Sequence, residues 1–301
     1  MTAEAAQSPL AAPFSQIAAD INTLFDQVLG VPDDARDRLV EAMRYAAMGG
    51  GKRLRPILVC ASADLFGVPR SMSLRAGLAV ECIHAHSLIH DDLPCMDDDD
   101  LRRGKPTVHV AFDEATAVLA GDALLALAFD ILGAAETHPD AEVRVELTRE
   151  LSRAAGAWGM AGGQMLDLRP MAGPVDMDAV ARLQRLKTGA IIAWSVDAGA
   201  VLGRASSEER TSLRGFAHSL GLAFQIADDM LDCSGNAATV GKRLRKDEEQ
   251  GKATFVTLLG EDRARRQAQM LIDQAVEHLK PFGARSALLR HIAKFSVDRA
   301  Y

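Results

Sequence analysis

Residues 90–100 read HDDLPCMDDDD, and residues 225–232 read QIADDMLD. Each of these acidic clusters ends a long apolar stretch with the pattern of a helix. Carboxylates placed so closely repel one another, and hard divalent cations bound by oxygen ligands are the natural compensation. Because Mg²⁺ usually brings substrate phosphates with it, the two clusters predict helices that end at a magnesium and phosphate site.

The spacing in residues 225–232 gathers the acids on one part of a helix. Asp228 and Asp232 stand at positions i and i+4, so they lie one above the other. Asp229 lies about 100° round the helix from Asp228. A solvated acidic helix end is the alternative interpretation of a single cluster. Two clusters, each at the end of an apolar run, favour the metal site instead.

The first cluster contains a helix breaker. Pro94 separates Asp91 and Asp92 from the acids that begin at Asp97. Because proline bends or ends a helix, these later acids can fold back toward the point where the helix stops. The cations of LRRG, residues 101–104, come directly after the cluster, which favours a charged site over a solvated helix end.

The chain of 301 residues has the composition of a globular protein, with 48% hydrophobic and 25% charged residues. The net charge of −7 argues against general nucleic-acid binding. None of the four cysteines forms a CxxC pair, which predicts reduced thiols in a cytoplasmic protein. No uninterrupted apolar run reaches the roughly 18 residues of a membrane span. Residues 1–13 lack the basic start of a targeting peptide, and we expect a flexible N-terminus there.

The hydrophobic pattern is helical along the chain, with no convincing strand alternation and no linker rich in proline or serine. The longest segments expected to be helices are 14–28, 71–92, 112–135, 178–203 and 207–232. Residues 112–135 are apolar on nearly every side, which is typical of a buried helix. Residues 206–209, SSEE, read as a helix start. We therefore predict a single all-α domain over residues 14–301, a large helical bundle around a central apolar cavity with both acidic clusters at one end.

A glycine-rich segment with cations precedes the first cluster. Residues 49–56 read GGGKRLRP, so glycines lie directly before Lys52 and Arg55. Glycines let a backbone approach a ligand closely, and the neighbouring cations suit a phosphate-like group. The GxxxxGK[ST] spacing of a P-loop is absent. On its own the segment would be interpreted as a flexible loop with solvated charges; beside the aspartates it indicates phosphate binding.

Further polar groups adjoin the apolar helices. The cations are Arg102, Arg103, Lys187, Lys242 and Lys252, and the neutral donors or acceptors are His84, Thr188 and Gln225. Cations and metal-binding acids around an apolar interior suit a substrate with a diphosphate head and a hydrocarbon tail. Diphosphate becomes a leaving group once Mg²⁺ and cations stabilise the charge that develops on it. The allylic cation left behind would have to be kept from water.

Together these motifs resemble those of the trans-isoprenyl diphosphate synthases, and within that family they are similar to the bacterial farnesyl diphosphate synthases. Residues 84–98 resemble the family's first aspartate-rich motif in its form with a two-residue insertion, and residues 101–104 resemble the family's next segment. The other matching segments keep the family order, and they are 51–56, 187–189, 225–232 and 251–252. The resemblance covers about residues 40–300. It implies the all-α isoprenoid synthase fold.

The resemblance also implies a prenyltransferase. Its reaction would ionise dimethylallyl or geranyl diphosphate, join C1 to C4 of isopentenyl diphosphate and then remove a proton, with the departing diphosphate as base. The product would be (E,E)-farnesyl diphosphate, and geranylgeranyl diphosphate stays open as the alternative. The family further implies three Mg²⁺ ions in each active site and a cytoplasmic homodimer.

The resemblance implies roles for particular residues. The catalytic residues would be Asp91, Asp92, Lys187, Asp228 and Asp229. Asp91 and Asp97 would hold Mg²⁺ on the allylic diphosphate, and Asp228 would hold a third ion from the other side, with Asp232 nearby. The allylic diphosphate would be bound by Arg102, Lys187, Thr188, Gln225, Lys242 and Lys252. The diphosphate of isopentenyl diphosphate would be bound by Lys52, Arg55, His84 and Arg103.

Product length is implied by the residue five positions before the first aspartate, which is His86, with Ser87 next to it. Bacterial farnesyl diphosphate synthases have an aromatic residue there, and many geranylgeranyl diphosphate synthases have alanine. Imidazole is intermediate in size, so the floor of the cavity would lie deeper than under a phenol ring. We expect the farnesyl product because the surrounding sequence resembles that subgroup.

Three other functions fit parts of the pattern. A terpene cyclase also uses a DDxxD motif, but its second metal site has a different spacing and it lacks a pocket for isopentenyl diphosphate. A non-catalytic subunit of a prenyl synthase tends to lose one aspartate motif, whereas this chain has both. An acidic calcium-binding protein of the EF-hand type would need glycine and glutamate positions that residues 97–100 lack.

Overall fold

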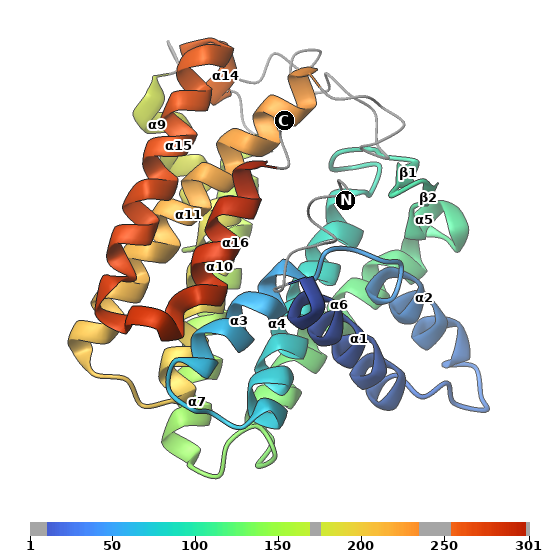
Figure 1. Cartoon of the computed structure of the whole chain (residues 1–301). Helices are drawn as coiled ribbons and strands as arrows, with labels where there is room; N and C mark the ends of the chain where they lie inside the picture. Colours follow the sequence, from blue (N-terminus) through green and yellow to red (C-terminus); the bar gives the residue numbers. More distant parts are fainter. Residues whose placement is uncertain (1–10, 169–175, 235–253, 299–301) are drawn as a thin grey trace. The chain divides into compact units, whose positions relative to one another are not determined.

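The computed structural model describes residues 11–168, 176–234 and 254–298, whose regular structure is almost all helical (Figure 1). The helices are α1 (Ala11–Val28), α2 (Asp37–Ala47), α3 (Leu54–Asp64), α4 (Arg70–Asp91), α5 (Val108–Ala111), α6 (Glu114–Gly133), α7 (Ala141–Ala155), α8 (Met160–Leu168), α9 (Met177–Gln184), α10 (Ala190–Leu202), α11 (Ser207–Ser234), α14 (Phe255–Leu259), α15 (Glu261–His278) and α16 (Ala287–Asp298), with a π-helical turn η2 (Arg185–Gly189) and a 3₁₀ helix η3 (Lys280–Ser286). The predicted all-α fold is confirmed.

One small hairpin departs from the expectation of helices alone. The strands β1 (Leu101–Arg102) and β2 (Lys105–Pro106) pair antiparallel. The turn between them consists of Arg103 and Gly104, which have φ angles of 55° and 76°. Two successive residues with positive φ are what a tight two-residue hairpin turn requires. The strands are too short for an alternating sequence pattern to reveal them.

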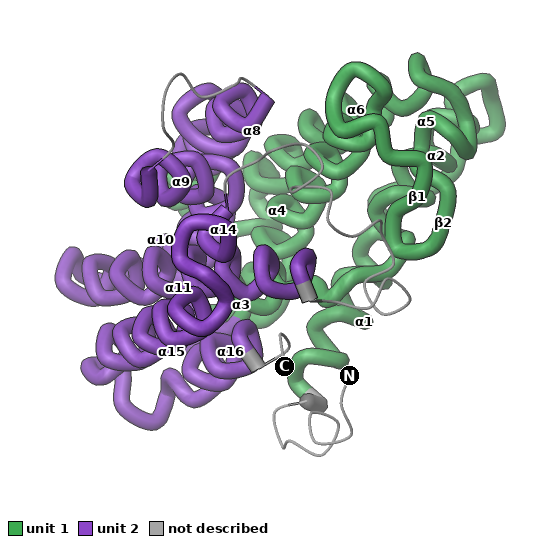
Figure 2. The backbone as a smooth tube through the Cα atoms, turned by 90° about the horizontal axis from the view of Figure 1, so that it is seen from above, with its two compact units in different colours: residues 1–60, 68–148 green, residues 61–67, 149–301 purple. Residues whose placement is uncertain are grey.

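The chain divides into two compact units, shown in separate colours in Figure 2. Unit 1 comprises residues 1–60 and 68–148, and unit 2 comprises residues 61–67 and 149–301. Two of the boundaries fall inside α3 and α7, and the third falls in the turn between α3 and α4. The single domain expected over residues 14–301 stays a prediction.

Unit 1 is built on helices α4 and α6, which pack along each other. Helices α1 and α2 pack against α4, and α5 packs against α6. The core contains large aliphatic and aromatic side chains from these helices, including Ile21, Phe25, Leu78, Ile83, Ile89, Leu124 and Leu132. Helix α4 ends at Asp91, three residues before Pro94, as the sequence predicts.

Helix α6 is less buried than its composition suggests. Leu119 is 57% exposed and Val118 is 40% exposed, so the expectation of a helix buried on all sides is wrong. Composition alone does not say which neighbours cover a helix, and here α6 packs against α4, α2 and α5 while Val118 and Leu119 stay exposed. Among the described residues, α6 is the one helix long and apolar enough to cross a membrane, but the core helix of a globular protein passes the same test.

Unit 2 is built on the 28-residue helix α11. Helix α15 lies along it, and α10, α14 and α16 pack against it as well (Figure 1). The predicted start of α11 is confirmed by a pair of bonds: the amide of Glu209 donates to the hydroxyl of Ser206 at 3.2 Å, and the amide of Ser206 donates to the carboxylate of Glu209 at 2.9 Å. This reciprocal arrangement is a capping box.

The long helix expected over residues 178–203 is interrupted. The π-helical turn η2 separates α9 from α10 and contains Lys187, Thr188 and Gly189. Helix α8 packs against this turn so closely that a Cβ atom at Gly163 would overlap the backbone nitrogen of Lys187. Single π-helical turns inside α-helices occur frequently at functional sites.

Candidate active site

The first acidic cluster folds back onto the end of α4. The amide of Asp97 donates to the carbonyl oxygen of Asp91 at 2.8 Å, and the amide of Asp99 donates to that of Asp92 at 3.3 Å. Asp98 takes the left-handed conformation, with φ of 52°, which turns the chain. These bonds place Asp97 beside Asp91, as expected from the position of Pro94. The backbone of the acidic turn therefore lies against the last turn of helix α4.

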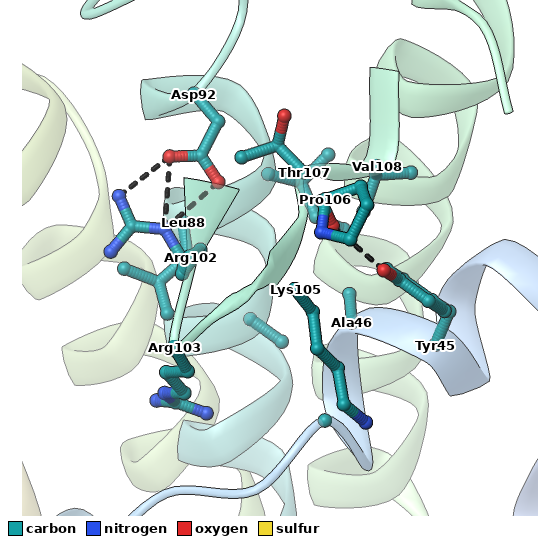
Figure 3. Close-up of a pocket in the computed structure, with 13 residues that line it drawn as sticks. Tyr45, Ala46, Leu88, Asp92, Arg102, Arg103, Lys105, Pro106, Thr107 and Val108 are labelled. Carbon is teal, nitrogen blue, oxygen red and sulfur yellow. Dashed lines mark hydrogen bonds and ion pairs between the residues drawn. The ribbon is translucent and has the colours of Figure 1, made fainter. Parts of the chain in front are cut away.

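Asp92 is buried and forms an ion pair with Arg102. The Nε atom of Arg102 donates to both carboxylate oxygens of Asp92, at 2.9 and 2.8 Å, and its Nη2 atom donates to Oδ1 at 2.6 Å (Figure 3). Burial raises the pKa of Asp92, and the guanidinium of Arg102 opposes that rise. Such a fork of charge-assisted bonds is geometrically specific. The pair fixes the start of the hairpin on the end of α4.

Arg103 contacts the glycine-rich segment. Its Nη1 atom donates to the carbonyl oxygen of Gly50, and a Cβ atom at Gly51 would lie 2.8 Å from its guanidinium nitrogens. Gly51 also has a φ of 126°, which side-chain-bearing residues rarely adopt. Glycine is required here both for the backbone conformation and for the close approach of Arg103. The sequence predicts the close approach of a phosphate-like ligand to these glycines; the structure shows an arginine close to Gly51, and phosphate binding stays a prediction.

His84 lies on α4 within the electrostatic influence of the same cations. Burial holds the pKa of His84 well below its ordinary value, and the charges of Arg55, Arg103 and Arg102 lower it further. The imidazole is therefore neutral at pH 7 and can donate one hydrogen bond and accept another. His84, Arg55 and Arg103 thus belong to one neighbourhood of unit 1, and Lys52 lies exposed in the segment that Arg103 contacts.

A cleft in unit 1 opens beside these groups (Figure 3). Its walls come from α2, α4, α5 and the hairpin, and the lining residues are Tyr45, Ala46, Gly49, Ala85, Leu88, Ile89, Asp92, Arg102, Arg103, Lys105, Pro106, Thr107 and Val108. The hydroxyl of Tyr45 donates to the carbonyl oxygen of Pro106 at 2.7 Å, which ties α2 to the hairpin. The lining combines apolar side chains of α2 and α4 with the cationic side chains of the hairpin.

Unit 2 carries a chain of hydrogen bonds from the π-helical turn to the second acidic cluster. The hydroxyl of Thr188 donates to Gln225 at 3.3 Å, and the amide of Gln225 donates to Asp229 at 2.9 Å. The backbone amide of Phe255 donates to the other oxygen of Asp229 at 3.0 Å. Asp229 is buried, and both of its oxygens are used within the protein. Asp228 and Asp232 are half-buried on the same helix.

Lys187 forms an ion pair that the sequence interpretation did not assign. Its Nζ atom lies 2.6 Å from Oδ2 of Asp167 on α8. Asp167 follows the glycine-rich stretch 156–163, whose last two glycines, Gly162 and Gly163, lie within α8, and this stretch was the available signal. The sequence did not show that Asp167 pairs with Lys187, because the two residues are 20 positions apart.

No role was assigned to Arg53 from the sequence, although it lies in the glycine-rich segment with Lys52 and Arg55. Unlike Lys52 and Arg55, it is buried, and it pairs with Glu81 of α4.

The predicted ligands Lys242 and Lys252 lie outside the described residues.

His86 and Ser87 lie on α4, one turn before its acidic end, and both are half-buried. The Nδ1 atom of His86 contacts the carbonyl oxygen of Gly121 on α6, and its ring packs edge-on against His90 with centroids 4.5 Å apart. The predicted chain-length position is thus located at the contact between the two central helices of unit 1.

Within residues 11–168, 176–234 and 254–298, no three His, Cys, Asp or Glu side chains are arranged to hold a metal ion by themselves. Mg²⁺ is usually bound through one or two carboxylates, with waters and substrate phosphates completing its octahedron. Asp91 and Asp97 at the end of α4, and Asp228 and Asp232 on α11, carry carboxylates that could supply such ligands. Hard carboxylate oxygens are the ligands that Mg²⁺ prefers.

Comparison with known proteins identifies relatives over most of the chain. A model of the polyprenyl synthetase family matches residues 36–287. The farnesyl diphosphate synthase of Escherichia coli (strain K12) is 48% identical over 266 residues, which cover 87% of this chain and 89% of that protein. A chloroplastic geranylgeranyl pyrophosphate synthase of Catharanthus roseus is 42% identical over 251 residues, or 83% of this chain and 70% of that protein.

Solved structures of prenyl-transferring enzymes are also similar to this chain. The chain is similar to the crystal structure of an FPP/GFPP synthase from Zymomonas mobilis in its apo form, with a TM-score of 0.88 and 53% identity, covering 96% of this chain and 98% of that one. It is also similar to a geranyltransferase from Helicobacter pylori complexed with magnesium and isoprenyl diphosphate, with a TM-score of 0.83 and 31% identity, covering 97% and 98% of the two chains.

Proposed function

This chain belongs to the polyprenyl synthetase family, and we propose that it joins isopentenyl diphosphate to dimethylallyl or geranyl diphosphate to give (E,E)-farnesyl diphosphate. The observation that carries the proposal is that the parts needed for diphosphate chemistry are present in both units. Unit 1 has the acidic turn at the end of α4 with Arg102 and Arg103. Unit 2 has the bonded series from Thr188 through Gln225 to Asp229. A non-catalytic subunit would not need both.

Asp91, Asp97 and Asp228 are the proposed ligands of Mg²⁺, with Asp232 close to Asp228. When bound, Mg²⁺ neutralises the charge on the allylic diphosphate and makes it a better leaving group. The carboxylates of Asp92 and Asp229 are already used by protein donors, so they are assigned to support and not to direct ligation. Asp92 holds Arg102, and Asp229 holds Gln225. Three ions per site remains our proposal for the number.

The side chains around the allylic diphosphate have a common task, which is to stabilise negative charge as the C1–O bond breaks. We assign this task to Arg102, Lys187, Thr188 and Gln225, together with Lys242 and Lys252. The ammonium of Lys187 is held by Asp167 and the hydroxyl of Thr188 by Gln225, so both groups are oriented before substrate arrives. The released diphosphate takes the proton lost from the condensed product, which balances the reaction without a dedicated base.

Isopentenyl diphosphate is proposed to bind through Lys52, Arg55, His84 and Arg103. A neutral His84 contributes as a hydrogen-bond donor, because its pKa lies well below the ordinary value. The cations supply the charge. This division explains why a histidine surrounded by arginines is tolerated: an imidazolium there would be repelled by Arg55 and Arg103.

Geranylgeranyl diphosphate is the second candidate product. The observation that favours it is the residue at the chain-length position, where His86 is smaller than the aromatic residues of bacterial farnesyl diphosphate synthases. The hydrogen bond of His86 to α6 favours the farnesyl product, because it holds the imidazole in one place.

The test is a product assay. Purified protein receives isopentenyl diphosphate with dimethylallyl or geranyl diphosphate, once with Mg²⁺ and once with EDTA. Chromatography of the dephosphorylated products should give farnesol in the Mg²⁺ sample and none with EDTA. If geranylgeraniol were formed instead, the proposed prenyl transfer would stand and the proposed product would change to geranylgeranyl diphosphate. No elongation with either primer would refute the synthase proposal and favour a non-catalytic subunit.

We also propose a homodimer, with a cytoplasmic location as predicted from the cysteines. The support is the apolar surface of α6, where Leu119 and Val118 are exposed although the helix is long and apolar. Adjacent exposed apolar side chains are a common feature of protein–protein interfaces. Light scattering after size exclusion should give the mass of two chains for wild type, and Leu119→Glu should shift the mass toward one chain.

A further inference from the structure

Arg53 lies between Lys52 and Arg55 but points into the core of unit 1. It is 4% exposed. Its Nη1 atom donates to Oε1 of Glu81 at 2.8 Å, and its Nη2 atom donates to the side chain of Asn22 at 2.7 Å and to the carbonyl oxygen of Ala47 at 2.6 Å. The guanidinium therefore joins α1, the end of α2 and α4 at one point.

The backbone of Arg53 is in an unfavourable conformation. Its φ is 49°, in the left-handed region that residues with a Cβ atom rarely adopt. Such strain persists only where the surroundings determine the conformation, and it occurs often at functional sites. The carbonyl oxygen of Arg53 also accepts the amide of Ile57 at 3.0 Å, the first bond of α3. The conformation of Arg53 thus sets the direction in which Lys52 and Arg55 leave the segment.

Glu81 is the buried counterion of Arg53. It is 3% exposed, and its second oxygen, Oε2, is buried with no hydrogen-bond partner among the described residues. A buried carboxylate without its counterion is strongly unfavourable. Glu81 lies three residues before His84 on α4, so the two share one side of that helix. The ion pair therefore connects the segment that bears Lys52 and Arg55 to the part of α4 that bears His84.

The same segment is held from a second direction by Arg103, which bonds to the carbonyl oxygen of Gly50 and packs on Gly51. The segment 50–55 thus has one anchor in the core and one on the hairpin. Both anchors are arginines, and only Arg103 is exposed to solvent and able to meet a ligand.

We propose that the Arg53–Glu81 ion pair positions the binding site for isopentenyl diphosphate. It holds the strained segment 50–55 so that Lys52 and Arg55 reach the diphosphate together with His84. Arg53 and Glu81 touch no substrate and are positioning residues. The inference rests on the proposed function, because it concerns the second substrate of that reaction.

The test uses Glu81→Gln, which keeps the shape and removes the charge. The KM for isopentenyl diphosphate should rise about tenfold, the equivalent of roughly 1.4 kcal/mol, while the KM for geranyl diphosphate and the kcat at saturation stay within about threefold. Isothermal titration of isopentenyl diphosphate alone, with Mg²⁺ present, should show the same loss of affinity. Because this readout needs no turnover, it separates the inference from the proposed reaction.

A double variant guards against misfolding. Arg53→Met with Glu81→Met removes both buried charges, which is often tolerated where removal of one is not. The double variant should melt near the wild-type temperature and still bind isopentenyl diphosphate weakly. Asp197→Asn is the matched control, since Asp197 and Arg210 form a partly buried pair of 2.6 Å in unit 2. It should lower the melting temperature and leave the KM for isopentenyl diphosphate unchanged.

The outcomes are separable. Unchanged affinity for isopentenyl diphosphate in a folded Glu81→Gln or double variant would overturn the inference, as would an equal rise in both KM values. If the wild-type protein bound isopentenyl diphosphate but did not elongate the allylic substrate, the proposed function would be refuted. The comparison of binding affinities would still test the inference.

Discussion

The Nδ1 atom of His86 lies 3.0 Å from the carbonyl oxygen of Gly121. Because a carbonyl oxygen only accepts, Nδ1 must carry the proton, which sets the tautomer of His86. Burial, followed by the nearby His90, lowers the pKa of His86 to about 4, so the ring is neutral at pH 7. The bond fixes the imidazole at the position proposed to limit product length.

Replacement of His86 by alanine should lengthen the product. The substitution removes the ring and its bond to α6, so the growing chain gains space beyond the fifteenth carbon. We expect geranylgeraniol to become the main dephosphorylated product when Mg²⁺ and geranyl diphosphate are supplied. The control is His86→Phe, which keeps a ring of similar or larger size and should retain farnesol. An unchanged product in His86→Ala would remove this residue from the control of chain length.

Gly121→Ala should destabilise the protein. A Cβ atom at Gly121 would overlap the imidazole of His90, which itself lies 3.2 Å from the carbonyl oxygen of Val118. Overpacking of this kind lowers the free energy of unfolding by roughly 1–3 kcal/mol. Thermal melting measures the effect.

Gly133→Ala is the matched control for that substitution. Gly133 is the last residue of the same helix, and nothing lies within 4 Å of a Cβ atom placed there. Alanine is the better helix former, so this variant should be neutral or stabilised by up to roughly 1 kcal/mol. Equal melting temperatures for the two variants would show that α4 and α6 do not need glycine for their contact.

Local features of the site were predictable from the sequence. The acidic turn follows from Pro94 and the short spacing to Asp97, and the start of α11 follows from Ser206 and Glu209. These features depend on residues a few positions apart, where backbone geometry alone decides. The family motifs likewise pointed to the correct fold.

Features that join distant segments were not predictable in this way. The partner of Arg53 is 28 residues away, and that of Lys187 is 20 residues away. The sequence around Arg53 resembles an exposed basic loop, and only the packing of α1, α2 and α4 shows that its guanidinium is buried. The π-helical turn at Lys187 is a second case, because its residues continue an ordinary helical pattern and the close packing of α8 accompanies it.

The stability of the protein should fall as the pH is lowered from 7 to 5. The pKa of His86 is about 4 in the folded protein and near its ordinary value in the unfolded chain, so the unfolded chain binds the additional proton first. The contribution is fully present above the ordinary pKa of about 6.5 and is lost as the pH falls toward 4. Asp122 and His90 are the charged and titratable neighbours named with His86, and Asp122 acts in the opposite sense to burial.

The measurement is the melting temperature of wild type and of His86→Gln at pH 7 and pH 5. Glutamine does not titrate, so the wild type should lose more stability than the variant over this interval, by about 1 kcal/mol after allowance for its partial exposure. An equal fall in melting temperature for the two proteins between pH 7 and pH 5 would contradict a low pKa for His86.

Asp167→Asn should slow the chemical step. Asp167 holds the ammonium of Lys187 at 2.6 Å, and this part of η2 is proposed to stabilise the departing diphosphate. Without the carboxylate, Lys187 keeps its charge but loses its fixed orientation, and orientation is what makes a cation effective as charge develops in the transition state. We expect kcat to fall about tenfold, less than the roughly 10²–10³-fold for complete loss of one preorganised donor, with the KM for isopentenyl diphosphate unchanged. The control is Glu150→Gln on α7, which breaks surface ion pairs with Arg149 and Arg153 and should leave both constants as they are. If Asp167→Asn raised the KM for isopentenyl diphosphate and left kcat intact, the ion pair would belong to the second substrate, and the assignment of Lys187 to the allylic diphosphate would have to be withdrawn.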